Sequence, residues 1–103
     1  MKASGIYCIR NIVNDKRYVG SAVYLTKRFC DHKKHLRKGT HHSVKLQRAW
    51  NKHGEQNFVF EVLEVVPDLA HQIAVEQWWL DKHNAAHPDL GYNVSPTAGN
   101  WGS

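Results

Sequence analysis

The strongest constraint on the fold is a pair of short strand-like stretches near the start of the chain, separated by a turn. Apolar residues at positions 4–11 recur with a period of two, which is typical of a half-buried β-strand. A second such stretch follows at positions 16–21. Asn14 and Asp15 lie between them, and both residue types tolerate the left-handed backbone conformations of tight turns. The sequence therefore predicts a β-hairpin.

The register of this hairpin decides which side chains share a face of the sheet. With positions 14 and 15 as the two turn residues, Asn11 pairs with Tyr18 and Ile9 pairs with Gly20. Paired residues share a face and successive residues alternate, so Tyr7 and Tyr18 are expected to project from the same side. Two tyrosines on one face fit either a packed aromatic pair or a reactive pocket, and the hairpin by itself favours packing.

Residues 24–38 have the pattern of an amphipathic helix. Their apolar positions lie at helical spacing, at Leu25, Phe29 and Leu36. Gly39 follows as a natural stop for the helix. Arg28 and His32 are four residues apart, so the helix brings them to one patch beside its apolar face. A solvent-exposed role explains these two poorly, because they flank apolar positions.

A second helix and a third strand follow. Residues 44–53 are expected to be helical, with Ser43 as the N-cap and Gly54 at the end. Residues 57–66 are the strongest strand candidate, because they are rich in β-branched and aromatic residues and end at Pro67. We expect this strand to pair with the hairpin. The predicted fold class is therefore α+β, a small three-stranded antiparallel sheet flanked by three or more helices.

Residues 68–83 are the last expected helix, with Asp68 as a candidate cap. Its expected buried stripe consists of Leu69, Ile73, Glu76 and Leu80. A carboxylate in the middle of a buried stripe is costly unless it is paired or bound to a cation. A surface glutamate belongs on the opposite face, so the position of Glu76 favours a functional role.

Length and charge bound the function. A chain of 103 residues forms one domain, and 42% hydrophobic residues suffice for a compact core. The 14 Lys and Arg outnumber the 9 Asp and Glu, which gives a net charge of +5 and favours a polyanionic partner such as nucleic acid. No stretch approaches the roughly 20 apolar residues of a membrane span. A protein of the cytoplasm is expected.

Neither cysteines nor histidines indicate a structural metal site. Cys8 and Cys30 lack CxxC spacing, and we expect two buried small residues in a reducing compartment. Four of the eight histidines cluster in one stretch, at His32, His35, His41 and His42. Because no cysteines accompany them at zinc-site spacing, a structural zinc is not favoured.

The unusual positions together suggest hydrolytic chemistry on a phosphodiester. They are Tyr7, Tyr18, Arg28, His32 and Glu76. A single inward carboxylate suits a hydrated Mg²⁺ ion, which takes one or two carboxylates and keeps several waters. An Arg and a His beside such an ion suit a transition state that gains negative charge. A tyrosine is a difficult general base because its ordinary pKa is about 10.

The same residues carry a family resemblance. Gly5-Ile6-Tyr7 followed by Tyr18-Val19-Gly20 resembles the paired signature of the GIY-YIG nuclease superfamily, with Val in place of Ile in the second triplet. The later motifs of that family are matched by Arg28, His32, Glu76 and Asn93. The similarity runs from position 4 to about position 94. The stretch 41–54 is similar to the catalytic domains of phage group I intron homing endonucleases in particular.

The resemblance implies a DNA endonuclease that uses one divalent metal ion, Mg²⁺ or Mn²⁺. Glu76 is then the metal ligand. Tyr7, alone or with Tyr18, positions or deprotonates the attacking water. Arg28 stabilises the pentavalent phosphorane, and His32 assists with the phosphate or a proton.

Further implied residues lie outside this central set. Asn93 is expected to brace the site from the tail. His41 is a further site residue, although the adjacent His42 could serve instead. The expected DNA contacts are the basic residues Lys27, Lys45, Arg48 and Lys52.

The expected organisation is a catalytic domain at residues 1–95 and a tail at 96–103, which starts a linker to a separate DNA-recognition domain. The partner is DNA, and the protein is expected to be monomeric. Two alternatives stay open at this level. One is a repair or structure-specific incision nuclease of the same superfamily, and the other is a DNA-binding module without catalytic activity.

Overall fold

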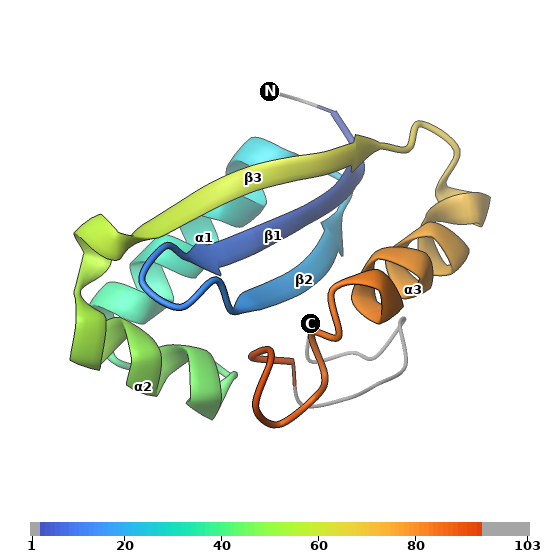
Figure 1. Cartoon of the computed structure of the whole chain (residues 1–103). Helices are drawn as coiled ribbons and strands as arrows, with labels where there is room; N and C mark the ends of the chain where they lie inside the picture. The colour runs from blue at the N-terminus through green and yellow to red at the C-terminus, as the bar shows by residue number, and fades with distance from the viewer. Residues whose placement is uncertain (1–2, 94–103) are drawn as a thin grey trace.

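The computed structural model describes residues 3–93 and forms an antiparallel sheet with helices on both sides (Figure 1). The strands are β1 (Gly5–Asn11), β2 (Arg17–Ala22) and β3 (Phe58–Val65). The α-helices are α1 (Leu25–Lys38), α2 (Val44–His53) and α3 (Gln72–Lys82). Two short 3-10 helices, η1 (Glu55–Asn57) and η2 (Leu69–His71), precede β3 and α3. The predicted α+β class with three antiparallel strands is confirmed.

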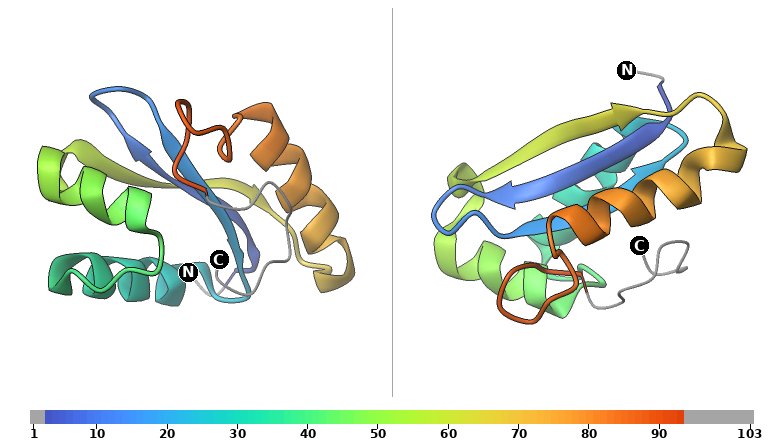
Figure 2. Two further views of the ribbon diagram at one scale, coloured as in Figure 1. Left: turned by 90° about the horizontal axis from the view of Figure 1, so that it is seen from below. Right: turned by 45° about the vertical axis from the view of Figure 1, so that its right-hand side comes forward.

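The sheet separates two layers of helices. Its strand order is β2-β1-β3, so β1 is central and β2 is an edge strand. Helices α1 and α2 cover one face, and α3 covers the other (Figure 2). Strand alternation sends Tyr7 and Ile9 into the core under α1 and α2. It sends Ile6 and Cys8 into a second core under α3.

The hairpin register differs from the prediction by two residues. Tyr7 pairs with Gly20 and Ile9 pairs with Tyr18. A two-residue slip preserves the face of every side chain, so both tyrosines lie on the same face as expected. Residues 12–16 form a longer loop than the predicted two-residue turn. It closes because the Asn11 backbone N–H donates to the Lys16 carbonyl at 2.9 Å.

Side chains within the loop explain its length. Asn11 Oδ1 accepts the Val13 N–H at 2.9 Å, and Asn14 Oδ1 accepts the Lys16 N–H at 3.0 Å. Asp15 takes the left-handed conformation with φ of 63°. The loop is therefore set by side chains that bond the backbone locally.

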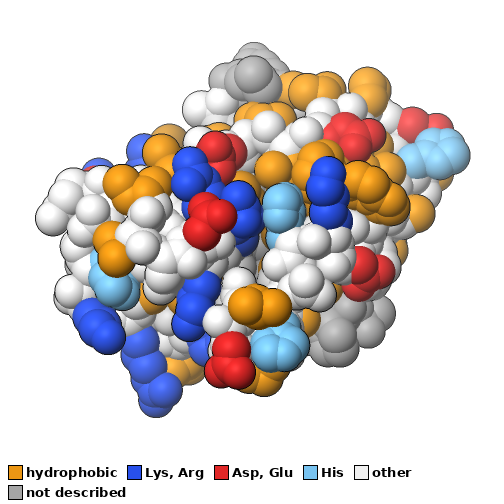
Figure 3. All heavy atoms as spheres, in the orientation of Figure 1, with side chains coloured by type: hydrophobic (Ala, Val, Ile, Leu, Met, Phe, Trp, Pro, Cys, Tyr) orange, Lys and Arg blue, Asp and Glu red, His pale blue; other side chains and the backbone are white. Residues whose placement is uncertain are grey.

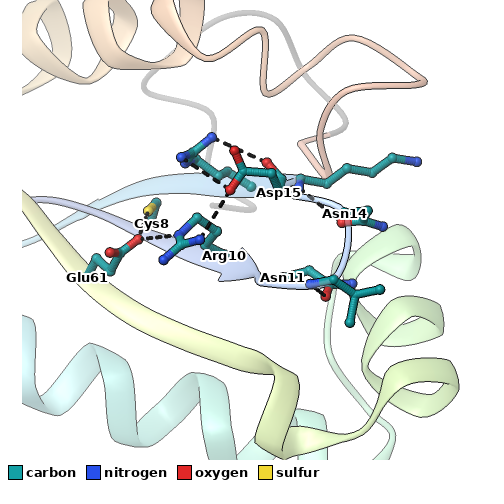
Figure 4. A network of polar contacts seen from close by, with 9 residues as sticks. Cys8, Arg10, Asn11, Asn14, Asp15 and Glu61 are labelled. Atoms are coloured by element: carbon teal, nitrogen blue, oxygen red, sulfur yellow. Dashed lines mark hydrogen bonds and ion pairs between the residues drawn. The ribbon is translucent and has the colours of Figure 1, made fainter.

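A polar network ties the same loop to β3 (Figure 4). Arg10 Nη1 donates to Asp15 Oδ1 at 3.2 Å, and Arg10 Nε donates to Glu61 Oε1 at 3.0 Å. The thiol of Cys8 donates to the same Glu61 oxygen. Burial and the Glu61 carboxylate raise the pKa of Cys8 to about 12, so the thiol stays protonated. The prediction of two buried cysteines is wrong for Cys30, which is exposed on α1.

Three predicted elements agree with the structure to within one residue at each end. They are the helices at 24–38 and 44–53 and the strand at 57–66. Gly39 ends α1 in the left-handed conformation, with φ of 77°. The side chain of Ser43 caps α2 by accepting the Leu46 N–H. These boundaries depend on local hydrogen bonds, which sequence patterns report well.

The last predicted helix is divided in two. Asp68 caps the 3-10 helix η2 by accepting the Ala70 N–H, and α3 begins only at Gln72. The 3-10 turn breaks the phase of the expected stripe, so Leu69 is exposed rather than buried. Ile73 is also exposed, because Gln72 faces the sheet instead and donates to the Ala22 carbonyl at 3.2 Å. Glu76 and Leu80 are buried as expected.

Gly20 allows the side chain of Tyr7 to cross the edge strand. A Cβ atom at position 20 would lie 2.5 Å from Tyr7 Oη and 2.6 Å from Tyr7 Cζ. Real Cβ atoms do not approach other atoms so closely, and only glycine therefore fits under the ring. The Tyr7 ring starts on the central strand and carries its hydroxyl over β2. The pairing of Tyr7 with Gly20 connects the two triplets of the hairpin physically.

Gly20→Ala is expected to displace the Tyr7 ring and to lower the free energy of unfolding by about 1–3 kcal/mol, the usual cost of overpacking a core. Urea denaturation measures the loss, and NMR of the His32 ring reports whether its contact with Tyr7 survives. Gly39→Ala is the control, since a Cβ there meets nothing within 4 Å. The control strains only the backbone and should leave the His32 resonances in place. Unchanged His32 resonances in Gly20→Ala would contradict this account.

Candidate active site

Side chains from separate elements meet at the edge strand β2. Tyr7 and Tyr18 project from the sheet toward α1, and both are buried. Their rings lie beside the imidazole of His32, with centroids 5.4 Å and 5.6 Å away. The tyrosine face is therefore packed, as the hairpin alone suggests, but it is packed against ionisable side chains. Packing and a reactive site are compatible here.

Helix α1 supplies the side chains that face the tyrosines. His32 is buried, and its Nε2 atom lies 2.5 Å from Tyr7 Oη. Arg28, one helical turn earlier, is half-buried and makes no side-chain hydrogen bond to any residue between 3 and 93. It also lines a hollow of about 230 Å³ next to the start of α1. The Arg28 guanidinium thus lies close enough to act on both tyrosines.

The loop between α1 and α2 adds two histidines. His41 is buried, and its Nε2 atom lies 2.7 Å from His32 Nδ1. His42 contacts the other tyrosine, with its Nε2 atom 2.9 Å from Tyr18 Oη. The imidazole rings of His41 and His42 stack on each other, with centroids 4.4 Å apart. The sequence left a choice between His41 and His42, and the structure places both at the site in contact with different partners.

Glu76 reaches the site from the opposite face of the sheet. It is buried on α3, and its Oε1 atom accepts a hydrogen bond of 2.5 Å from the hydroxyl of Ser21. Ser21 pairs with Ile6, whose side chain belongs to the core under α3. The site therefore wraps around the edge of β2. Ser21 was missed at the sequence level, although its position directly after the Tyr18-Val19-Gly20 triplet is a usable signal.

Asn93 pairs with the outer edge of β2 at Val19. Its Oδ1 atom accepts the Val19 N–H and its Nδ2 atom donates to the Val19 carbonyl, both at 2.8 Å. The side chain therefore satisfies both backbone groups of one edge residue, as a neighbouring strand would. A parallel bridge between Arg17 and Gly91 continues this contact. The contact fits the expected bracing role of Asn93, which stays a prediction.

Electrostatics couple the two sides of the strand. Burial raises the pKa of Tyr7 well above its usual range, and the neighbouring Tyr18 raises it further, while Arg28 lowers it. Burial likewise raises the pKa of Tyr18, with Arg28 again opposing. Burial raises the pKa of the Glu76 carboxyl, while the Ser21 hydrogen bond and Arg28 lower it. Arg28 is thus the cation that acts on both tyrosines and on Glu76.

The buried histidines are neutral at physiological pH. Burial and the adjacent His41 lower the pKa of His32 to about 3. Burial and His42 lower the pKa of His41 to about 4. His42 is exposed, and the partial burial of its ring and the nearby Arg28 lower its pKa. Positive charge at the site therefore comes from Arg28 and not from imidazolium.

The donor set fits a hydrated divalent cation held by one carboxylate. Among residues 3–93, no group of three or more His, Cys, Asp or Glu side chains is arranged to enclose a metal. Mg²⁺ commonly binds through one or two carboxylates and keeps several waters. Glu76, fixed by Ser21 and buried near Arg28, offers such an anchor.

The predicted DNA-contacting residues lie on helices α1 and α2. Lys27 pairs with Asp31 one turn along α1 at 3.1 Å. Helix α2 carries the other three, Lys45, Arg48 and Lys52. Basic side chains gather over α2, at the lower left of Figure 3. These positions give the α1–α2 side of the molecule a basic surface.

Comparison with known proteins places this arrangement in a family. A family model described as the GIY-YIG catalytic domain matches residues 3–93. Intron-associated endonuclease 1 of Enterobacteria phage T4 is 46% identical over 97 residues. The match covers 89% of this chain and 37% of that protein. The chain thus spans little more than a third of the length of this relative.

Two solved structures have the same fold. One is a mutant of the catalytic domain of intron endonuclease I-TevI, with a TM-score of 0.84, 40% identity, and coverage of 95% of this chain and 99% of that one. The other is the catalytic domain of homing endonuclease I-TevI, with a TM-score of 0.82 and 43% identity. It is matched over 89% of this chain and 98% of its own. The similarity therefore covers a whole catalytic domain.

The buried histidines predict how stability depends on pH. The pKa of His32 is about 3 in the folded chain and about 6.5 when unfolded, so the unfolded state binds the proton more readily. The stability that this provides is complete above pH 6.5 and is lost as the pH falls toward 3. We expect the free energy of unfolding, measured by urea denaturation, to decrease as the pH is lowered from 7 to 5, by at most about 1.4 kcal/mol per pH unit for each buried histidine. His32→Gln should flatten this slope, and a pH-independent midpoint in the wild type would contradict the assignment.

Proposed function

The chain belongs to the GIY-YIG catalytic domain family and is related to phage intron homing endonucleases, and from this we propose that it hydrolyses phosphodiester bonds of DNA with one divalent metal ion. The observation that carries the proposal is the meeting of Glu76, Arg28 and two tyrosines at the edge of β2. They come from α3, α1 and the hairpin, and no core-packing requirement explains a buried carboxylate there. A buried carboxylate is suited to a cation, and a neighbouring guanidinium is suited to a phosphate, so the two ligands can bind side by side.

Each residue has a role that its surroundings support. Glu76 holds the ion, and Ser21 fixes the orientation of its carboxylate by donating to Oε1. When bound, the divalent ion polarises the phosphate and lowers the pKa of water. Arg28 places its guanidinium where negative charge develops on the phosphate oxygens. Asn93 keeps the edge strand in place through Val19.

The tyrosines position the nucleophile. In the reaction, a water oxygen bonds to phosphorus, the water proton passes to a base, and the ester bond to the leaving sugar oxygen breaks. Tyr7, alone or with Tyr18, holds this water or accepts its proton. Because both hydroxyls are buried, a water that contacts them is removed from bulk solvent. Arg28 favours the phenolate, and burial opposes it.

The name and the length of the T4 relative suggest what kind of enzyme this chain comes from. T4 intron-associated endonuclease 1 is much longer than the matched region, so we propose that this chain is the catalytic part of a homing enzyme with a separate DNA-recognition domain. The proposed linker at 96–103 lies outside the described residues. No helix among residues 3–93 is long and apolar enough to cross a bilayer. A monomer in a reducing cytoplasm stays part of the proposal.

Glu76→Gln is expected to lower the rate of plasmid nicking by about a hundredfold or more, because it removes the metal-binding charge and keeps the size of the side chain. The assay compares Mg²⁺, Mn²⁺ and EDTA, which also identifies the ion. Glu64→Gln is the matched control, since Glu64 is an exposed carboxylate that accepts a hydrogen bond from Trp79. Full activity in Glu76→Gln or in EDTA would overturn the proposal. DNA binding without cleavage in any divalent ion would instead favour a module without catalytic activity.

The basic residues of α2 should govern DNA affinity. Replacing Lys45, Arg48 and Lys52 with Gln is expected to weaken binding equally across DNA sequences and to reduce the salt slope by about 0.9 for each lost phosphate contact. Fluorescence anisotropy at several salt concentrations measures the slope. Lys82→Gln on α3 is the control and should keep the wild-type slope. Tight, sequence-selective binding by residues 1–103 would contradict the need for a separate recognition domain.

A further inference from the structure

The hydrogen bonds behind Tyr7 form a chain whose direction is fixed at its far end. The chain runs from Tyr7 through His32 and His41 to the N-terminus of α2. Neutral imidazole has one N–H donor and one acceptor nitrogen, so each link determines the next. At the α2 end of the chain of hydrogen bonds, the donor is the backbone N–H of Ser43, which cannot act as an acceptor. The direction can therefore be read from that end.

The first link is the Ser43 N–H, which donates to His41 Nδ1 at 3.0 Å. Because Nδ1 accepts, the proton of neutral His41 is on Nε2. That nitrogen lies 2.7 Å from His32 Nδ1 and donates to it. The proton of His32 is then also on Nε2, which lies 2.5 Å from Tyr7 Oη. His32 therefore donates to Tyr7, and the tyrosine oxygen accepts.

Gln47 on α2 holds the loop between α1 and α2, which carries His41. Its Oε1 atom accepts the His41 N–H at 3.0 Å, and its Nε2 atom donates to the Leu36 carbonyl and to Asn51 Oδ1, both at 3.0 Å. A carbonyl can only accept and a backbone N–H can only donate, so the amide cannot be flipped. Gln47 is buried and ties the end of α1 to His41. Its side chain thus holds the backbone of His41, the residue whose ring accepts the Ser43 N–H.

We propose that Gln47 is a positioning residue, which together with the Ser43 N–H sets the tautomers of His41 and His32 so that Tyr7 receives a hydrogen bond. This inference rests on the proposed nuclease function of the same site. It gives Tyr7 a donor that stabilises its phenolate form and leaves its own proton directed away from His32. Charge-neutral histidines are required, which agrees with the lowered pKa values of both rings.

The direction of the chain is measured without a variant. In ¹⁵N-labelled protein at pH 7, long-range ¹H–¹⁵N correlation spectra distinguish the two neutral tautomers of each histidine. We expect both His32 and His41 to carry the proton on Nε2. A proton on Nδ1 of either ring would overturn the proposal and leave the nuclease proposal untouched. The expected tautomers in a protein that cleaves no DNA with Mg²⁺ or Mn²⁺ would sink the function and leave the tautomer assignment standing.

The role of Gln47 is tested by the pH dependence of cleavage. Gln47→Leu is expected to give mixed tautomers at His41 and to move the ascending limb of the pH profile of kcat up by about one unit, roughly tenfold in rate, with KM unchanged. Gln56→Leu makes the same chemical change at an exposed glutamine in η1 and should alter neither property. Gln47→Glu keeps the acceptor for the His41 N–H but loses the donor to the Leu36 carbonyl and to Asn51 Oδ1. Wild-type tautomers in this variant would assign the effect to the His41 contact, and mixed tautomers would refute that assignment, which covers the case of a leucine variant that does not fold. Wild-type tautomers and pH profile in Gln47→Leu would refute the positioning role.

Discussion

The close approach of the Tyr7 ring to the backbone of Gly20 is the contact on which the rest of the site depends. It lets a side chain from the central strand reach across the edge strand. The crossing brings the Tyr7 hydroxyl to His32 on α1. A side chain of any size at position 20 would push the ring away. The two triplets of the hairpin are therefore two halves of one packing arrangement.

The edge strand is where the two faces of the sheet can act on the same ligand. Helix α1 presents Arg28 and His32 on one face, and α3 presents Glu76 on the other. A central strand would separate these groups, because the sheet would lie between them. The edge does not, since side chains can reach around it. Asn93 lies on the adjacent part of the same edge, where its side chain bonds the backbone N–H and carbonyl of Val19. This part of the edge strand is therefore paired, although no further strand among residues 3–93 lies beside it.

Local signals predicted much of the fold, and each failure has a structural cause. The caps at Ser43 and Gly39 and the boundaries of α1, α2 and β3 agree with the structure because short-range hydrogen bonds decide them. The hairpin register was wrong by two residues, because side chains of the loop bond its own backbone. The buried stripe of the last helix was wrong at Leu69, because a 3-10 turn precedes α3, and at Ile73, because Gln72 faces the sheet instead. Periodicity carries no information on such interruptions.

By itself, the sequence determined the family signature, the α+β class and the inward position of a carboxylate at Glu76. These follow from residue types at fixed spacings, which are properties of the chain alone. Only the tertiary structure decided that Glu76 approaches from the face opposite the tyrosines, that Ser21 orients it, and that His41 and His42 contact different partners. Those relations join residues far apart in the chain, and they depend on how helices pack on a sheet. Pattern and spacing cannot specify them, because packing is decided by the whole core.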